Sequence, residues 1–135
     1  MAAGILAGML AGERATVESA GTDAPVGNPP TRFAVETVRK LGVDISEYRA
    51  RRLTREMLKQ ADLVLVMESY HRDRVLALLP KARDRTRLLL QYAGRPGVEV
   101  EDPIGGSIDD YERTVAVMMP ALEQVAAEIR QRLGR

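Results

Sequence analysis

The sequence predicts an α/β domain in which helices cover both faces of a small parallel sheet. The run from Leu63 to Met67 is apolar at every position, as in a strand that is buried on both faces. Strand and helix patterns alternate along the chain, which is typical of a parallel sheet with helical crossovers. No break in composition divides the 135 residues, and that length can build one hydrophobic core, so we expect residues 1–135 to form a single domain.

The composition narrows the class of protein. Apolar residues make up 45% and charged residues 29%, as in ordinary globular proteins. Lys and Arg number 20 against 19 for Asp and Glu, so the sequence predicts neither a nucleic acid nor an anionic membrane as a partner. There is no cysteine and only one histidine, His71, which we expect at the surface near a helix start. Disulfides, cysteine nucleophiles and Ser-His-Asp triads are therefore disfavoured for these residues, while carboxylate-based magnesium sites stay open.

The first part of the chain predicts a helix, a short strand and a loop. Residues 1–12 place apolar side chains on one helical face, and we expect this helix to end at Gly12. It is too short to cross a bilayer, so its regularly spaced glycines favour close packing against a neighbouring element (Gly4, Gly8 and Gly12). Residues 15–19 are typical of a strand, and residues 20–30 form a loop with two glycines and three prolines.

Two helices and a basic cluster come next. Residues 31–41 have helical periodicity, with Gly42 as the expected terminator. Thr54 is the expected cap of a short helix that ends at about Gln60. Between the helices lie four arginines that would suit an anion but more often form a solvated, ion-paired surface, which we favour here (Arg49, Arg51, Arg52 and Arg55).

The second half repeats the strand and helix pattern. After the strand at residues 63–67, Ser69 is a candidate cap for a helix that runs to Leu79, and residues 87–90 predict the next strand. From Ser107 an apolar stripe at spacings of three and four predicts a long last helix. Pro120 lies inside this helix and is expected to kink it or divide it in two.

The stretch from Glu101 to Ser107 is the best candidate for a functional site. Asp102 precedes a proline, so its backbone should be extended and its carboxylate free to point into a cleft. The glycines at 105 and 106 permit unusual backbone angles, and Ser107 with Asp110 resembles a capping box. The loops at 21–30, 68–71 and 91–106 should open at the carboxyl edge of the sheet, where ligands bind in such folds. A capped turn with a solvated acid is the alternative.

Four segments stand out by their order and spacing: Ser19-Ala20-Gly21-Thr22, Asp44-Ile45-Ser46 with Arg49-Ala50-Arg51, the run from Ala61 to Met67, and Asp102-Pro103. Together they resemble the low-molecular-weight protein phosphatases that act on phosphotyrosine or phosphoarginine, and the match covers essentially the whole chain. The resemblance implies a four-stranded sheet, a cytoplasmic enzyme without metal or other cofactor, and a phosphorylated protein or small phosphomonoester as substrate. It also implies a phosphocysteine intermediate and assigns to Asp102 the role of general acid.

One part of the family pattern is absent. Its members carry a first, central strand followed by a Cys-x5-Arg-Ser loop that supplies the nucleophile and binds phosphate, whereas this sequence starts with what resembles the following helix. We expect an N-terminally truncated and inactive form of a phosphatase, or alternatively a natural pseudophosphatase or binding module. Without that strand two inner edges of the sheet would be unpaired, so we expect a rearranged sheet or a homo-oligomer, including a domain swap.

The residues expected to flank the substrate are not aromatic. Tyrosine-directed members usually place aromatic side chains where this sequence has Ala24 and Pro25 in one loop and Ile104 after Asp102-Pro103. The run from Asp102 to Tyr111 is similar to the bacterial branch that includes protein-arginine phosphatases. Phosphotyrosine and phosphoarginine therefore both stay open, whereas arsenate reductases of this fold need several cysteines.

Overall fold

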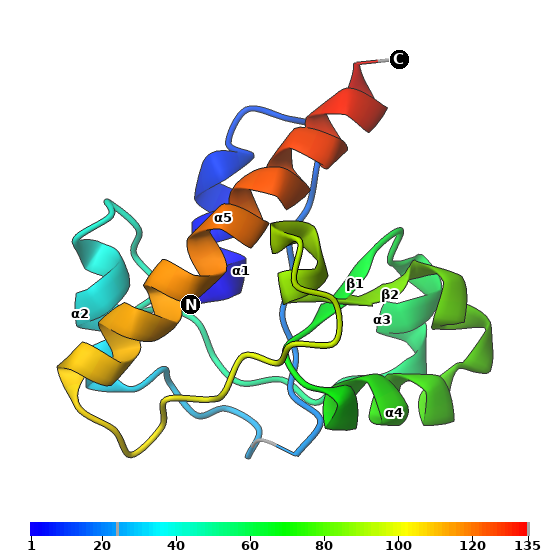
Figure 1. Cartoon of the computed structure of the whole chain (residues 1–135). Coiled ribbons are helices and arrows are strands. Elements are labelled where there is room, and N and C mark those ends of the chain that lie inside the picture. The colour runs from blue at the N-terminus through cyan, green and yellow to red at the C-terminus, as the bar shows by residue number, and fades with distance from the viewer. Residues whose placement is uncertain (24, 135) are drawn as a thin grey trace.

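The computed structural model describes residues 1–23 and 25–134, and it has the expected α/β architecture with a small parallel sheet (Figure 1). Strand β1 (Val64–Val66) pairs in parallel with β2 (Thr86–Leu88). The other elements are α1 (Ala2–Met9), α2 (Arg32–Arg39), α3 (Arg55–Gln60), α4 (Ser69–Leu78), the 3-10 helices η1 (Pro80–Arg85) and η2 (Leu89–Ala93), and α5 (Ile108–Leu133).

Strand β1 separates two hydrophobic clusters. Val64 and Val66 contact the smaller cluster, formed mainly by α3, α4, η1 and β2. Leu63, Leu65 and Met67 contact the larger cluster, formed mainly by α1, α2, η2 and α5. Because successive side chains of a strand point to opposite faces, this alternation confirms the sheet as the middle layer between two layers of helices.

Burial of the strand is incomplete, contrary to the prediction. Val66 is buried, whereas Val64 and Leu65 are only half-buried. Among the described residues the sheet has two strands rather than the four that the resemblance implies. The apolar run at 63–67 therefore has the composition of a central strand, but within the described residues it pairs with a neighbouring strand on one side only, as an edge strand does.

Two of the predicted helix caps, at Thr54 and Ser107, are confirmed, and Thr31 caps α2 in the same way without having been predicted as a cap. The hydroxyl of Thr31 accepts a hydrogen bond from the Ala34 N–H (3.3 Å), and that of Thr54 accepts one from Met57 (3.2 Å). Ser107 and Asp110 form the predicted capping box at the start of α5. These side chains satisfy backbone N–H groups that have no partner inside the helix.

The cap predicted at Ser69 is wrong. Glu68 is the N-cap position of α4 without a side-chain bond, and Ser69 is the first helical residue. Its N–H instead donates to the carboxylate of Glu99 (2.6 Å), which comes from a loop thirty positions later in the chain. A negative group at the positive end of a helix is favourable, so this remote carboxylate takes the place of the local hydroxyl.

Close packing of α1 is confirmed at one of its glycines. Gly4 is buried, and a Cβ at this position would overlap the Cγ2 atom of Ile45. At Gly8 the nearest atom to such a Cβ would be Cγ2 of Val43 at 3.7 Å, which is an ordinary contact. The helix itself ends at Met9, and Gly12 lies in the following turn with a φ of 86°.

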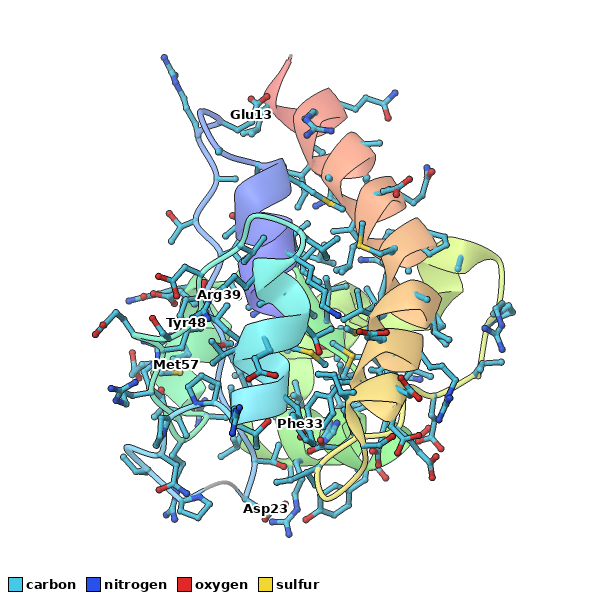
Figure 2. The ribbon with its side chains drawn as sticks, turned by 90° about the vertical axis from the view of Figure 1, so that its left-hand side faces the viewer. Glu13, Asp23, Phe33, Arg39, Tyr48 and Met57 are labelled. Atoms are coloured by element: carbon cyan, nitrogen blue, oxygen red, sulfur yellow. The ribbon has the colours of Figure 1, made fainter. Side chains whose placement is uncertain are left out.

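Helices α2 and α5 pack together and complete the larger cluster. Figure 2 shows Phe33 of α2 beside the first turns of α5, where its ring meets Tyr111 edge-on with centroids 5.9 Å apart. The Thr31 hydroxyl donates to the Tyr111 hydroxyl (2.9 Å), and Lys40 forms an ion pair with Glu112 (2.5 Å). Helix α5 continues through Pro120 without interruption, so the prediction that this residue divides the helix is wrong.

The strand predicted at residues 15–19 is also wrong. This segment forms no strand, and pairing begins only at Gly21, which makes an isolated parallel bridge with Arg52. The Gly21 N–H donates to the carbonyl of Arg51 (2.7 Å), and its carbonyl accepts from Leu53 (2.9 Å). Strand propensity is expressed only where a second strand supplies hydrogen bonds, and residues 15–19 have no such neighbour among the described residues.

Candidate functional site

Three loops meet at the carboxyl end of β1, as predicted. The Tyr70 hydroxyl donates to the carboxylate of Asp23 (2.6 Å), which joins the loop after residue 20 to the start of α4. The Ser69–Glu99 hydrogen bond joins the third loop to the same helix. The Val100 N–H donates to the carbonyl of Met67 (2.9 Å), directly after β1. The loop that carries Asp102 is therefore fixed at the edge where α/β folds bind ligands.

Asp102 lies on a tight turn at the rim of a groove of about 650 Å³. Asp102 is exposed, and one oxygen of its carboxylate accepts a hydrogen bond from the Ile104 N–H (3.0 Å). Gly105 has a φ of 82°, and a Cβ at Gly106 would lie 2.9 Å from the Pro103 carbonyl oxygen. Both glycines are therefore needed for this turn, one for its backbone angle and one for space.

The start of α1 lies near the Asp102 carboxylate. Burial lowers the pKa of the Met1 amino group, and the negative charge of Asp102 acts in the opposite direction and raises that pKa. The amino end of a helix carries the positive end of the macrodipole. The arrangement thus combines a carboxylate and a positive helix terminus at one edge of the fold.

The other predicted site residues are not all gathered at this groove. Ile104 lines it together with Asp102, and its side chain is 68% exposed. Pro25 is exposed but lines neither this groove nor the larger cleft described below. Ala24 lies outside the described residues.

A polar cluster between the loop after residue 20 and α4 was not predicted. Figure 2 labels Asp23 in this loop, which accepts hydrogen bonds from Tyr70 and from Thr22 (3.0 Å). These bonds, first that of Tyr70, lower the pKa of Asp23. Arg74 donates to the Tyr70 hydroxyl (2.7 Å) and lies 3.5 Å from Asp23. The spacing of Tyr70 and Arg74 by four positions indicates a contact on one helix face, but no local signal identifies Asp23 as their partner.

Two arginines of the basic cluster, Arg49 and Arg51, donate hydrogen bonds to backbone carbonyls instead of forming ion pairs. Arg51 donates to the carbonyl of Ser19 (3.1 and 3.3 Å), and Arg49 donates to the carbonyls of Ser46 (2.9 Å) and Tyr48 (2.7 Å). Within residues 1–23 and 25–134, none of the four arginines forms a salt bridge. The four arginines are exposed, as expected of a solvated surface, but the expected ion pairs are not formed in the described part of the chain.

A cleft of about 1090 Å³ lies between residues 14–22 and the run at 63–67. We refer to it as the inter-edge cleft. Leu6, Leu122 and Ile129 line it from the layer of α1 and α5, and Leu58 and Val75 line it from the layer of α3 and α4. His71 also lines this cleft and is half-buried, so the prediction that it is a surface residue holds only in part.

The fold and this edge define a three-layer α/β protein with an acid-bearing loop beside a helix amino terminus. Residues 1–134 match the sequence model of the family described as low molecular weight phosphotyrosine protein phosphatase. The chain therefore belongs to this family of hydrolases.

The chain is similar both to proteins named as protein-tyrosine phosphatases and to proteins named as protein-arginine phosphatases. The low molecular weight protein-tyrosine-phosphatase Etp of Escherichia coli is 34% identical over 119 residues, which cover 88% of this chain and 76% of that protein. A protein-arginine-phosphatase of Bacillus subtilis is 31% identical over 120 residues, covering 89% and 79%. The structure of an arginine phosphatase from Geobacillus stearothermophilus superposes with a TM-score of 0.86 and 28% identity over 97% of this chain and 84% of that one.

Neither a membrane-crossing helix nor a metal-binding cluster occurs among the described residues. None of the helices in the described part of the chain combines the length and the apolar character needed to cross a membrane. Within residues 1–23 and 25–134, no three side chains of histidine, aspartate or glutamate are grouped so that they could hold a metal ion.

Proposed function

We propose that Asp102 is the general acid of a protein phosphatase site whose nucleophile, a cysteine thiolate, is not among these 135 residues. In the complete reaction the thiolate forms a bond to phosphorus, the bond from phosphorus to the leaving group breaks, and Asp102 gives its proton to that leaving group. Water then cleaves the phosphocysteine. The observation that carries this proposal is the position of Asp102, held by the Ile104 N–H at the edge where three loops and the start of α1 meet.

The chain as it stands is expected to show no turnover. A carboxylic acid can donate a proton, but it neither captures the phosphoryl group nor forms the covalent intermediate. The test is hydrolysis of an aryl phosphate by this chain beside a version preceded by a strand and a Cys-x5-Arg-Ser loop. We expect activity only in the second, with Asp102→Asn reducing it by roughly 10²–10⁴-fold. Turnover by the short chain that disappears in Asp102→Asn would overturn this account.

Phosphotyrosine and phosphoarginine are both candidate substrates. Relatives named for each activity have similar identity to this chain. The aliphatic Ile104, exposed at the rim beside Asp102, offers no ring to stack on either a phenyl or a guanidinium group, so it leaves both substrates open. Comparing phosphoarginine with an aryl phosphate in the extended version decides between them.

A non-catalytic pseudophosphatase or binding module is the second candidate function. Arg52 is exposed and has no carboxylate partner among the described residues, so its charge is available to an anion. Phosphopeptide binding without turnover, abolished by charge reversal at Arg51 and Arg52, would support this function. Binding that persists in the reversed variant would exclude it.

The family also suggests a cytoplasmic location, and the inter-edge cleft supports association with another polypeptide. A second copy of the chain is one such polypeptide, through an oligomer or a domain swap. Light scattering over a range of concentrations tests self-association, which a monodisperse monomer would exclude.

A further inference from the structure

The loop that carries Asp102 is held at both of its ends. The Val100 N–H donates to the Met67 carbonyl (2.9 Å), directly after β1, and Ser107 begins α5 with its capping box. In Figure 1 this loop is the yellow stretch that runs between η2 and α5. Between the two ends the Asp102 carboxylate is exposed, and the Ile104 N–H that it binds belongs to the same turn. The position of Asp102 relative to the sheet is therefore set by the ends of the loop.

Glu99 adds a side-chain bond to the first of these ends. Its carboxylate accepts a hydrogen bond from the N–H of Ser69 (2.6 Å), which is the first residue of α4. The N–H groups of a first helical turn have no partner inside the helix, and the helix dipole is positive there, so a carboxylate is a favourable acceptor. Glu99 and Val100 thus attach two adjacent positions of the loop to the segment that follows β1.

Asp102 lies close to this attachment along the chain. It follows Val100 by two residues, so even an extended backbone carries it no more than about 7 Å away. A general acid must come within about 2.6–3.2 Å of the atom that it protonates, and a displacement of about 1 Å can cost up to about 10²-fold in rate. Over so short a stretch, loosening the attachment displaces the carboxylate by an amount that affects the chemistry.

We propose that Glu99 is a positioning residue for Asp102: its bond to the start of α4 holds the loop in the place from which Asp102 protonates the leaving group. This inference rests on the proposed role of Asp102 as the general acid. Glu99 acts only through Asp102, so the proton still passes from Asp102 to the leaving group and no bond forms or breaks at Glu99.

The Glu99–Ser69 bond can be removed from either partner. Glu99→Ala removes the acceptor, whereas Glu99→Gln keeps an oxygen that can accept the same bond. Ser69→Pro removes the donor and leaves Glu99 in place. Proline is favourable at the first position of a helix, and Glu68 before it already has an extended backbone (φ −133°, ψ 155°), so α4 should tolerate this change.

The first measurement uses the chain of 135 residues and requires no activity. Glu99→Ala and Ser69→Pro should each lower the hydrogen-exchange protection of the Val100 amide by about threefold or more, because this end of the loop opens more often. Glu99→Gln should recover most of the protection. Thr54→Ala is the matched control, since it removes a comparable cap bond at the start of α3 (3.2 Å) and should leave the Val100 amide unchanged.

The second measurement uses the version preceded by a strand and a Cys-x5-Arg-Ser loop, with aryl phosphates whose phenols are strong or weak acids. A misplaced general acid lowers kcat/KM more for the weakly acidic phenol, which needs the proton to leave. Glu99→Ala and Ser69→Pro should each lower kcat/KM by about tenfold for this substrate and much less for the other. Glu99→Gln should recover most of the loss, and Thr54→Ala should show none. In Asp102→Asn, adding Glu99→Ala should cause no further loss.

The outcomes distinguish failure of this inference from failure of the proposed function. If Asp102→Asn leaves the ratio of the two substrates unchanged, Asp102 is not the acid and the proposed function fails. If Asp102→Asn changes the ratio but neither Glu99→Ala nor Ser69→Pro does, only the role of Glu99 is refuted. Unchanged protection of the Val100 amide in both variants would refute that role as well.

Two further results would also overturn the role of Glu99. A loss of activity in Glu99→Ala but not in Ser69→Pro would show that Glu99 contacts the substrate directly. Equal losses for both substrates would show that the bond supports the fold and does not position the acid. If circular dichroism shows that Glu99→Ala does not fold, Ser69→Pro decides both measurements alone.

Discussion

Gly4→Ala and Gly8→Ala add the same methyl group to the same helix, and we expect opposite effects on stability. Replacing a helical glycine by alanine stabilises a helix by up to about 1 kcal/mol because alanine loses less backbone entropy on folding. At Gly8 the new Cβ would lie 3.7 Å from Val43, in ordinary contact, and position 8 is exposed. We therefore expect Gly8→Ala to stabilise the protein by about 0.5–1 kcal/mol.

At Gly4 the steric term opposes this gain. The new Cβ would overlap the Cγ2 atom of Ile45 and lie 3.2 Å from Cγ1 of Val43. Ile45 is 2% exposed and belongs to the larger cluster, so it has no free space into which it can move. Overpacking of a core usually costs about 1–3 kcal/mol, which offsets or exceeds the gain in helix propensity. The two variants should differ by about 1–3 kcal/mol, with Gly4→Ala the less stable.

Urea denaturation followed by far-ultraviolet circular dichroism measures this difference. With a denaturant slope of about 1–3 kcal/mol per molar, the midpoints of the two variants should differ by roughly 0.3–3 M. Gly4→Ser provides a further control, because it adds the same Cβ and an extra atom and should be still less stable. A Gly4→Ala variant that is as stable as Gly8→Ala would refute the packing of α1 against Ile45.

Three further predictions concern the last helix, the loop after residue 20 and the proposed acid. Ser107→Ala removes the cap at the start of α5 and should destabilise the protein by about 1 kcal/mol in urea, whereas Ser107→Asp should retain most of the stability. Because hydrogen bonds lower the pKa of Asp23 in the folded state, its contribution to stability is present above the unfolded value near 3.8 and is lost as the pH falls through the lower folded pKa. Tyr70→Phe removes the hydrogen bond that contributes most to the lowered pKa of Asp23. The urea midpoint of this variant should therefore lie below that of the unmodified chain at about pH 6, and the two midpoints should converge at about pH 2. A difference that stays constant between these pH values would contradict this prediction. In the version with a restored cysteine loop, Asp102→Asn should reduce hydrolysis of an aryl phosphate more than that of a substrate whose leaving group needs no proton; equal losses would argue against an acid role.

Features that depend on neighbours in the sequence could be predicted. The predicted caps at Thr54 and Ser107 each bind an N–H three positions later, so the residue type and its spacing contain all the information needed. The alternation of strands and helices similarly indicated the α/β class. The turn at Asp102 follows from the proline and glycines around it, because their backbone preferences act over a few residues.

Features that depend on distant partners could not be predicted. The α4 start is capped by Glu99, thirty positions away, so the hydroxyl of Ser69 was a misleading local signal. Asp23 and Tyr70 are 47 positions apart, and only the folded chain brings them together. The segment at 15–19 has the residues of a strand, but strand structure needs hydrogen bonds from a neighbour that the described residues do not supply.

The inter-edge cleft and the Asp102 edge are physically connected. Met1, Thr22 and Met67 line the cleft, and the negative charge of Asp102 acts on the amino group of Met1. The cleft therefore reaches the start of α1, within the field of the Asp102 carboxylate. Any nucleophile that Asp102 serves must lie at this edge too, since acid and nucleophile act on opposite sides of one phosphorus atom. The cleft and the chemistry at Asp102 thus share one small region of the fold, and the segment that carries the nucleophile must lie there.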